Sequence, residues 1–586
     1  MATARVTAVG ARWLFPKTEG DLAAALAREL QVRPLTARVL AARGFIDASG
    51  ARRFLSPSLD HLHDPLRMAG MAEAVARIRG AIAANEKILI YGDYDVDGAT
   101  SVVILKKAIE MAGGRADFHV PHRLRDGYGM RAEAIEMAAA RGVSLIVSVD
   151  TGIRANEVVR GARERGIDVI VTDHHLPEAE LPPALAVINP HRHDCAYPDK
   201  NLCGAGVTFK LVQALVGTLA WTAARRARVL ESFLKLVAIA TVADVVPLTG
   251  ENRTIVRHGL AGLRSVHNAG LKALLEVAGF REGAAPTAGQ VAFRVAPRIN
   301  AAGRMASAED VVELFLTNDA ERARAIAAQL HQLNQERQQT EAEIVRSILE
   351  ECERTPVTDA NAALVFCGRD WHRGVVGIVA SRLVERFHRP VFVLGRNPED
   401  GLAQGSGRGI PGFHLLAALE SMADLFVRFG GHEHAAGVAL EAARVDEFRR
   451  RFNARAAACL RPEDFLPRLE IDALAGLADL TEPNAADVFA LAPFGRGNPP
   501  PLFAALGVEV AGVSPLGKDG KHLRVTVRGG GRVLELKAWR FAERAAELPL
   551  GARVDVAFTI EEDAYSAARG YPGWAANLRE VRPAPG

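Results

Sequence analysis

Short apolar runs alternate with helical patterns between residue 86 and about residue 190. The helical patterns cover residues 99–112 and 156–165, where apolar positions recur at helical spacing. Nearly every position of 145–150 is apolar, which is typical of a strand buried on both faces. The alternation predicts an α/β domain with a mostly parallel sheet, whose expected strands are 88–91, 117–120, 145–150 and 169–172.

The two ends of the chain have different patterns. Residues 356–462 open with an apolar strand at 363–366 and continue as a second α/β domain. Residues 463–586 contain several short alternating runs separated by Gly-rich turns, which predict a small β-barrel. Residues 1–80 look helical and rich in Ala and Arg, with expected core positions at Leu22, Leu26, Leu30 and Leu35.

A long helical pattern lies between the two α/β domains. It begins at an expected N-cap, Asn318, and continues to about residue 353, which at 1.5 Å per residue would span roughly 50 Å. Its middle is polar on all sides, as in helices that bridge domains through solvent. We therefore expect a helical region (1–80), a first α/β domain (81–317), a linker helix (318–355), a second α/β domain (356–462) and a barrel (463–586).

Composition narrows the class of protein only slightly. The 586 residues are 49% hydrophobic and 24% charged, which is ordinary for globular proteins. The net charge of +3 does not by itself indicate a nucleic-acid-binding protein, although it allows a local basic groove. The first twenty residues lack a signal-peptide core and no run of about 18 apolar residues occurs, so we expect a cytoplasmic protein without a membrane span.

The cysteines do not suggest a disulfide framework, because their number, five, is odd and they are scattered along the chain. His191, His193, Cys195 and Cys203 hint at zinc, but their spacing fits no standard finger. Buried or surface thiols are the preferred interpretation.

Acidic and imidazole side chains follow the strands of the first predicted sheet. Asp93, Asp95 and Asp97 come directly after the first strand, at alternate positions that point to one side of an extended chain. Asp150 ends the third run, and Asp173-His174-His175 follows the fourth. Since ligands bind outside the carboxyl ends of parallel strands, we expect these groups to lie at one edge. Carboxylates gathered there would repel one another unless a divalent cation lay between them.

Simpler interpretations exist for single elements of this pattern. Asp93 to Gly98 also resembles the start of a calcium-binding EF-hand loop, but the twelfth position is Ile104 rather than the required Glu. A solvated acidic turn is the other alternative. Asp244 follows an amphipathic helix and has apolar neighbours, so it is either a turn residue before Pro247 or a further metal ligand. The upstream pattern favours the ligand.

Three further segments suggest contacts with phosphate. A predicted loop at 297–304 carries two arginines, whose planar guanidinium groups suit phosphate oxygens. Glycine-rich loops are expected at 405–409, which includes Ser406 and Arg408, and at 430–437.

The C-terminal segment combines aromatic and basic residues, as in folds that hold single-stranded nucleic acid by stacking and charge. Packing within a core is the alternative for each aromatic residue. The aromatic residues are Phe503, Trp539, Phe541, Tyr565, Tyr571 and Trp574, and the basic ones are Lys518, Lys521, Arg524, Lys537 and Arg540.

These motifs, in this order, resemble a known superfamily. Asp93-Tyr94-Asp95-Val96-Asp97-Gly98, Asp150-Thr151-Gly152, Asp173-His174-His175 and Asp244 are similar to the signature motifs of the DHH phosphoesterases. Residues 371–380 and 430–437 look like the companion DHHA1 domain. The chain length, the 297–304 segment and the β-rich C-terminus narrow the resemblance to the RecJ family, over roughly residues 85–540. Gly409 departs from the family, in which a second Ser is expected at this position, and the departure affects at most one phosphate contact.

The resemblance implies roles for individual residues. Two divalent cations, Mn²⁺ or Mg²⁺, would be bound by Asp93, Asp95, Asp97, Asp150, His174 and Asp244, with Asp93 and His175 at the edge of the shell and Asp150 as the expected bridging ligand. The expected catalytic residues are Asp95, Asp97, Asp150, His174, His175 and Asp244. Substrate would be bound by Arg123, Arg304, Ser406, Arg408 and His432.

The implied architecture is an α/β multidomain protein with a parallel-sheet DHH catalytic domain, a long connecting helix, an α/β DHHA1 domain and a C-terminal barrel like an oligonucleotide-binding (OB) fold. The implied activity is metal-dependent 5′→3′ degradation of single-stranded DNA to mononucleotides in repair and recombination. A monomer that works with a single-strand-binding protein and a RecQ-type helicase is expected.

Two other functions are compatible with parts of the pattern. One is a DHH phosphodiesterase for short oligonucleotides or cyclic dinucleotides, but such enzymes usually lack a large C-terminal barrel. The other is a DNA-binding scaffold on an inactive DHH domain, which would have lost its acidic ligands, whereas all of them are present here.

Overall fold

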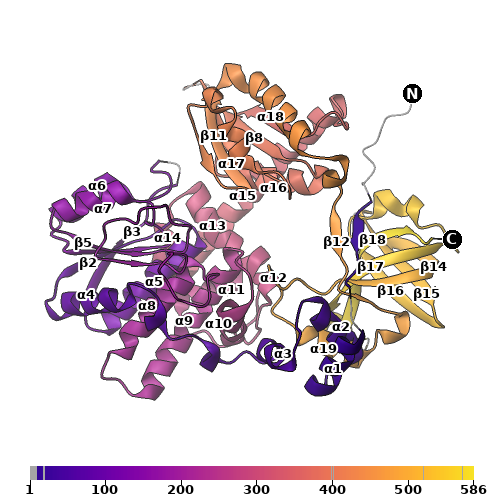
Figure 1. The fold of residues 1–586 in the computed structure, drawn as a ribbon, viewed down its shortest axis with the longest axis horizontal. Coiled ribbons are helices and arrows are strands. Elements are labelled where there is room, and N and C mark those ends of the chain that lie inside the picture. Colours follow the sequence, from indigo (N-terminus) through magenta and orange to yellow (C-terminus); the bar gives the residue numbers. More distant parts are fainter. Residues whose placement is uncertain are drawn as a thin grey trace. The chain divides into compact units, whose positions relative to one another are not determined.

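The computed structural model describes residues 10–17, 20–123, 125–397, 399, 401–518, 520–570 and 572–585 (Figure 1). The chain forms two compact units. One unit comprises Ser56–Arg337 with Pro493–Pro499, and the other comprises Met1–Leu55, Gln338–Ala492 and Pro500–Gly586.

A five-stranded parallel sheet organises the first unit. Its strand order is β3-β2-β4-β5-β6, and Ile90 on β2 lies beside Val147 on β4, which lies beside Ile170 on β5. The predicted strands are confirmed to within about two residues, whereas β6 was not predicted. The bounds are β2 (Lys87–Tyr91), β3 (Arg115–His119), β4 (Leu145–Val149), β5 (Asp168–Thr172) and β6 (Ala186–Ile188).

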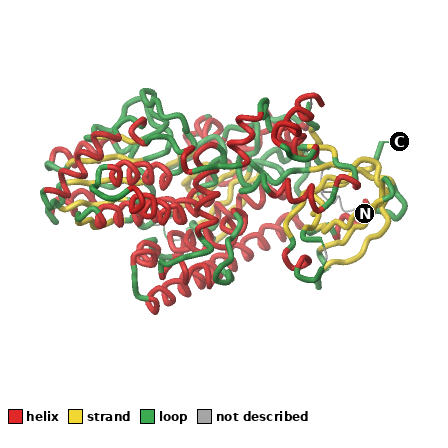
Figure 2. The backbone as a smooth tube through the Cα atoms, turned by 90° about the horizontal axis from the view of Figure 1, so that it is seen from below, coloured by secondary structure: helices red, strands yellow, loops and turns green. Residues whose placement is uncertain are grey.

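Helices cover both faces of this sheet (Figures 1 and 2), and the central strands β2, β4 and β5 are mostly apolar, as strands buried on both faces are. One face packs on α4 (Met71–Ala83), α5 (Val96–Met111) and α8 (Gly204–Gly217), and the other on α6 (Ala132–Ala140) and α7 (Asn156–Glu164). The unit also contains η1 (Leu59–His61), η2 (Pro65–Arg67), α9 (Ala223–Ala243), α10 (Gly250–Gly262), α11 (Ala269–Val277), α12 (Ala288–Gln290), η3 (Val291–Val295), α13 (Ala296–Met305) and α14 (Glu309–Leu316).

The prediction of a loop at 297–304 is wrong, because these residues belong to α13. Pro297 stands in the first turn, where a missing N–H leaves no helical hydrogen bond unmade. Gly303 does not break the helix but allows a close contact, since a Cβ there would lie 2.4 Å from the carbonyl oxygen of Tyr94.

The long connecting helix is confirmed as α15 (Ala320–Arg354). Two details of its prediction are wrong. Its first turn is capped by Asp319, whose carboxylate accepts from the N–H groups of Glu321 and Arg322, rather than by Asn318. Its polar middle is not fully solvated, because Arg337 and Glu341 are buried, and Glu341 pairs with Arg382.

The predicted second α/β domain is built around a five-stranded sheet of order β10-β11-β9-β8-β7, in which β7 and β8 are parallel and the other pairs are antiparallel. Its strands are β7 (Leu364–Arg369), β8 (Val391–Arg396), β9 (Leu402–Arg408), β10 (Arg428–Gly431) and β11 (Ala435–Glu441). Its helices are α16 (Val376–Phe387), α17 (Leu415–Glu420), η4 (Ala423–Leu425), η5 (Ala442–Arg444), α18 (Val445–Cys459) and η6 (Pro462–Phe465).

The two glycine-rich segments of this domain are mostly strands rather than the predicted loops. Gly405 and Gly407 lie on β9, and Gly437 on β11. A Cβ on Gly405 would lie 1.9 Å from the carbonyl oxygen of Val393, and one on Gly407 would enter the ring of Phe392. Glycine is therefore required here for close packing, not for a turn.

The C-terminal strands close into the predicted barrel, since β14 pairs with both β15 and β17. Its sheet has the order β13-β14-β15-β16-β18-β17. The elements are β13 (Ala473–Leu474), η7 (Leu477–Asp479), α19 (Glu482–Phe489), β14 (Phe503–Leu516), β15 (His522–Gly529), β16 (Arg532–Ala538), η8 (Ala542–Glu547), β17 (Arg553–Glu562), α20 (Ala564–Ala567) and β18 (Trp574–Pro583).

The N-terminal residues contain a strand besides the predicted helices. β1 (Arg12–Leu14) pairs in parallel with β12 (Arg468–Glu470), and α1 (Gly20–Leu30), α2 (Pro34–Ala42) and α3 (Ala48–Leu55) follow. Of the predicted core leucines, Leu26 and Leu35 are buried, whereas Leu22 and Leu30 are half-buried.

The aromatic residues of the barrel divide between core and surface. Phe503 and Phe541 are buried and belong to the core, whereas Trp539 is 48% exposed. Tyr571 and the side chain of Tyr565 lie outside the described residues. No helix among the described residues is long and apolar enough to cross a membrane.

Candidate metal centre

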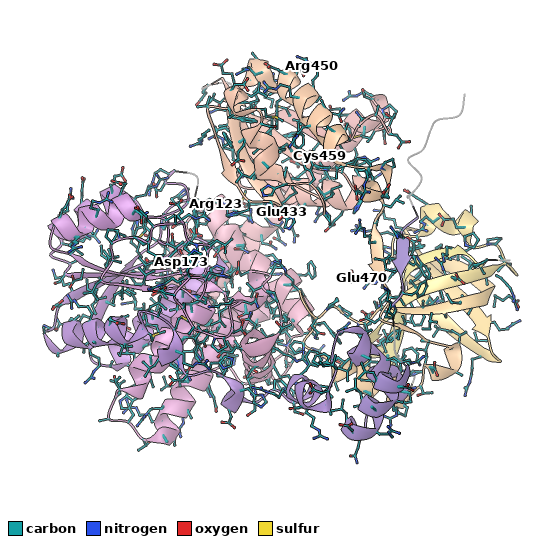
Figure 3. The ribbon with its side chains drawn as sticks, in the orientation of Figure 1. Arg123, Asp173, Glu433, Arg450, Cys459 and Glu470 are labelled. Atoms are coloured by element: carbon teal, nitrogen blue, oxygen red, sulfur yellow. The ribbon has the colours of Figure 1, made fainter. Side chains whose placement is uncertain are left out.

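The carboxyl ends of β2, β4 and β5 bring the predicted acidic and imidazole groups together. Three overlapping sets have ligand atoms within 4.8 Å of one another, which is close enough for a shared metal ion. Figure 3 labels Asp173 at this edge of the sheet. The three sets are Asp150 with His174 and His175, Asp97 with His174 and Asp244, and Asp93 with Asp95 and Asp150.

His174 lies at the centre of the cluster. Its Nε2 is 3.2 Å from Asp150 Oδ1, 3.8 Å from Asp97 Oδ2 and 3.8 Å from Asp244 Oδ2. Burial lowers the pKa of His174, against the opposing charge of Asp97, so the imidazole is neutral near pH 7. A neutral imidazole has the lone pair that a metal ligand needs.

Backbone groups fix the orientation of the acidic motif. The N-terminus of α8 points at Asp97, whose carboxylate accepts from the N–H groups of Gly204 at 2.6 Å and Ala205 at 2.7 Å. Asp95 caps α5, because its Oδ1 accepts from the N–H groups of Asp97 and Gly98. A Cβ at position 204 would lie 2.5 Å from Asp150 Oδ1, so glycine leaves the room that the Asp150 carboxylate occupies.

The cluster contains polar atoms that no protein group satisfies. Asp93 Oδ1, Asp150 Oδ1 and Asp244 Oδ2 are buried and lack hydrogen-bond partners. Burial, followed by the charge of neighbouring carboxylates, raises the pKa of Asp93 and Asp150, and raises that of Asp244 to about 9. Burial also raises the pKa of Asp97, although nearby His174 acts in the opposite direction. Buried oxygens that repel one another and have no donor fit divalent cations, which would satisfy and neutralise them.

Two groups around the cluster were not assigned from the sequence. Asp173 is buried and accepts from the N–H groups of Ile153 and His174, and its Oδ1 lies 2.7 Å from His175 Nδ1. Although burial lowers it, the Asp173 hydrogen bond raises the pKa of His175 to about 9. The Tyr128 hydroxyl lies 3.3 Å from the His175 ring nitrogens. Only the DHH tripeptide hinted at Asp173, and no sequence signal marked Tyr128.

Two of the predicted substrate-binding residues belong to the same unit as the cluster. The Arg123 guanidinium stacks on the ring of Tyr94, 4.8 Å from its centroid, and is labelled in Figure 3. Arg304 lies in the last turn of α13 and is half-buried. Tyr94 belongs to the acidic motif, so Arg123 is held beside the segment that carries Asp93, Asp95 and Asp97.

Ser406, Arg408 and His432 belong to the other unit. Ser406 and Arg408 lie on β9 and face the first turn of α16, since a Cβ at Gly377 would be 3.5 Å from Ser406 Oγ and 3.3 Å from Arg408 Nη2. Ser406 also lines a cavity of about 310 Å³ with Arg373 and Arg428. His432 is exposed in the turn between β10 and β11.

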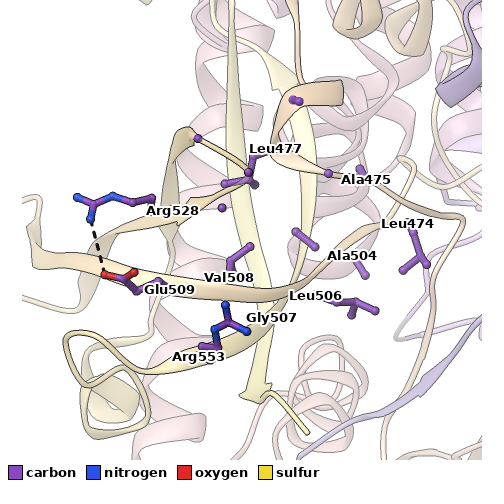
Figure 4. A pocket seen from close by; sticks show the side chains of 16 residues that line it. Leu474, Ala475, Leu477, Ala504, Leu506, Gly507, Val508, Glu509, Arg528 and Arg553 are labelled. Carbon is purple, nitrogen blue, oxygen red and sulfur yellow. Dashed lines mark ion pairs between the residues drawn. The ribbon is translucent and has the colours of Figure 1, made fainter. Parts of the chain in front are cut away.

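A larger cavity, about 560 Å³, lies on the barrel and is unrelated to these residues (Figure 4). It has an apolar wall with Leu474, Leu477 and Leu506, and a charged rim in which Arg528 lies 3.7 Å from Glu509. No predicted site residue lines it.

Family models match three parts of the chain. The N-terminal domain of the DHH family matches residues 87–241, the DHHA1 domain matches 359–458, and the RecJ OB domain matches 471–570. The metal cluster lies in or directly after the first match, and Ser406, Arg408 and His432 lie in the second. The predicted domain boundaries remain proposals.

Relatives that match most of this chain agree with the family models. RecJ of Bacillus subtilis, a single-stranded-DNA-specific exonuclease, is 39% identical over 93% of this chain and 68% of its own length. The exonuclease of the same name from Dickeya dadantii is 41% identical over 82% of this chain and 85% of its own. The crystal structure of RecJ with Mn²⁺ from Thermus thermophilus has a TM-score of 0.83 and 31% identity, covering 98% of this chain and 80% of that one. The chain therefore belongs to the RecJ family of single-stranded-DNA-specific exonucleases.

Proposed function

We propose that this protein is a divalent-metal-dependent exonuclease that degrades single-stranded DNA from its 5′ end to mononucleotides. The observation that carries the proposal is the cluster of unsatisfied buried carboxylates around His174, at the sheet edge where ligands bind in α/β folds. Membership of the RecJ family supports the substrate class. The short-oligonucleotide alternative is not favoured, because relatives that match most of this chain are named for single-stranded DNA.

We propose Asp93, Asp95, Asp97, Asp150, His174 and Asp244 as the residues that hold two Mn²⁺ or Mg²⁺ ions. Two such ions, when bound, would supply charge neutralisation and water activation for an in-line displacement at phosphorus. The chain's own contribution is orientation. The α8 N-terminus fixes Asp97, the room beside Gly204 admits Asp150, and Asp173 directs the His175 ring toward the cluster.

Features of the barrel favour a polymer as the substrate. Trp539 is half-exposed on its surface, donates from Nε1 to Asn577 Oδ1 at 2.9 Å, and packs edge-on against His522. A ring held in this way can stack a base at little entropic cost. A single-strand-binding protein and a RecQ-type helicase, which would supply single strands, are proposed partners on the family resemblance. Free cysteines at all five positions fit the proposed cytoplasmic location.

Arg408→Ala is expected to slow degradation of 5′-phosphorylated DNA roughly 10- to 100-fold, as for loss of a charged hydrogen bond of about 1.5–3 kcal/mol. The expected loss arises because Arg408 lies beside Ser406 at the N-terminus of α16, the positive end of the helix dipole, where a phosphate is favoured. The measurement is kcat/KM on one 30-mer with either a phosphate or a hydroxyl at its 5′ end. Arg450→Ala, which removes an exposed arginine of α18 in the same domain (Figure 3), is the matched control. Equal losses on both substrates would remove the phosphate role.

The function itself is tested with a single-stranded 30-mer labelled at its 3′ end, a blunt duplex of the same sequence, and a dinucleotide. The proposal expects Mn²⁺- or Mg²⁺-dependent shortening of the single strand from the 5′ end that EDTA abolishes, with the duplex spared. Rapid hydrolysis of the dinucleotide alone would place the protein among small-substrate phosphodiesterases.

A further inference from the structure

The turn that follows the metal-site residue Asp244 has an unfavourable backbone conformation. Asp244 is the C-cap of α9, and the next residue, Val245, has φ +58°. Helices commonly end with a residue in this left-handed region, but it is usually glycine. For a β-branched residue the conformation costs on the order of 1–3 kcal/mol, and it persists only where neighbouring groups enforce it.

The enforcing groups come from a segment about 250 residues further along the chain. The loop Pro493–Pro499 packs with the Asp244 unit rather than with the barrel that follows it in sequence. Arg496 contacts the turn at both ends, because its carbonyl accepts from the N–H of Leu248 at 2.7 Å and its Nη1 donates to the carbonyl of Val245 at 3.4 Å.

The loop fits this turn closely. Gly497 has φ +73°, and a Cβ there would lie 3.1 Å from the Pro247 Cβ. A Cβ on Gly495 would lie 2.7 Å from Leu248 Cδ1. Buried Asn498 closes the loop by exchanging backbone hydrogen bonds with Gly495 and donating from Nδ2 to the carbonyl of Pro493 at 2.8 Å. The loop therefore packs closely against the turn and favours the conformation that the turn has here.

We infer that the Pro493–Pro499 loop is a positioning element of the metal centre, which holds the Asp244–Leu248 turn so that the Asp244 carboxylate stays within reach of His174. This inference rests on the proposed role of Asp244 as a metal ligand. Residues that orient ligands typically affect metal affinity 10- to 100-fold. Arg496 is a positioning residue here, and its effect passes through the backbone of Val245 and Leu248.

The test measures Mn²⁺ binding directly, by the electron paramagnetic resonance signal of free Mn²⁺ in a titration of the full chain. Arg496→Ala and Gly497→Ala are expected to weaken the tighter Mn²⁺ site about 10-fold or more. The control, Arg264→Ala, removes an exposed arginine beyond the far end of α10, about 20 Å away along that helix, and is expected to bind as the wild type does.

A double variant separates conformational positioning from a simple charge effect. Val245→Gly removes the backbone strain at this position. In that background, Arg496→Ala should therefore lower the Mn²⁺ affinity less than about threefold. An equal loss in both backgrounds, or wild-type Mn²⁺ affinity in Arg496→Ala, would overturn the inference while leaving the proposed function intact. Absence of Mn²⁺ binding by the wild-type chain would overturn both. Arg496 is exposed, so its variant tests the idea even if Gly497→Ala does not fold.

Discussion

Asp150→Asn is expected to lower kcat on single-stranded DNA by at least about a thousandfold, which corresponds to roughly 4 kcal/mol of lost transition-state stabilisation. Asp150 belongs to two of the three metal-compatible sets and lies 3.2 Å from His174 Nε2. The amide keeps the size of the side chain but removes its charge, and its NH₂ group cannot be a ligand. Single-turnover kinetics at saturating Mn²⁺ measure the effect.

The matched control is Asp117→Asn, which removes an exposed carboxylate from β3 of the same sheet. It is expected to retain wild-type kcat. Thermal unfolding of metal-free Asp150→Asn should show no destabilisation, because burial raises the pKa of Asp150 and favours its neutral acid, which the amide resembles in charge and size. Activity within tenfold of wild type would exclude Asp150 from the reaction.

The second large effect is a steep pH dependence of metal affinity. Burial and the charges of Asp97 and Asp95 raise the pKa of Asp244 to about 9, and the pKa values of Asp93, Asp97 and Asp150 are also raised. Metal ligands must be deprotonated, so below about pH 9 an ion that binds to Asp244 displaces a proton from it. Mn²⁺ affinity should rise about tenfold or more per pH unit between pH 6 and pH 8.5.

The raised pKa values of these carboxylates also determine how the stability of the metal-free protein changes with pH. Because these pKa values are higher in the folded state than in the unfolded chain, the metal-free fold binds more protons and loses stability as pH rises from about 4 to 9. Saturating Mn²⁺ should weaken this trend, since ions then replace protons. Calorimetric titration in two buffers of different ionisation enthalpy counts the released protons. An Mn²⁺ affinity that does not change with pH would contradict the prediction that carboxylates of the cluster are protonated in the metal-free protein.

The sequence was sufficient for the parts of this site that local patterns encode. Apolar runs followed by Asp93–Asp97, Asp150 and Asp173–His175 predicted the parallel strands, and parallel strands imply a shared edge. Each residue that was predicted as a metal ligand lies in at least one of the three sets that could hold an ion. The pattern worked because each residue lies within a few positions of the strand that places it.

Features that depend on distant packing could not be predicted. Gly405 and Gly407 indicated loops, but they permit close approach between strands. The 297–304 segment contains Pro and Gly, yet it is a helix, in which Pro297 occupies the first turn and Gly303 allows close packing on Tyr94. Arg496 contacts the Asp244 turn from about 250 residues away, and only its Gly-Arg-Gly context, typical of a turn, could have drawn attention to it.

The central claim is that the acidic cluster is the divalent-metal centre of an exonuclease. Anomalous diffraction at the manganese absorption edge, from crystals of the wild-type protein soaked in Mn²⁺, tests it most directly. The account predicts two peaks roughly 3.5–4 Å apart within the cluster, with Asp150 between them, and loss of at least one peak in Asp150→Asn. Strong manganese peaks elsewhere on the protein, with none beside Asp150 and His174, would contradict it.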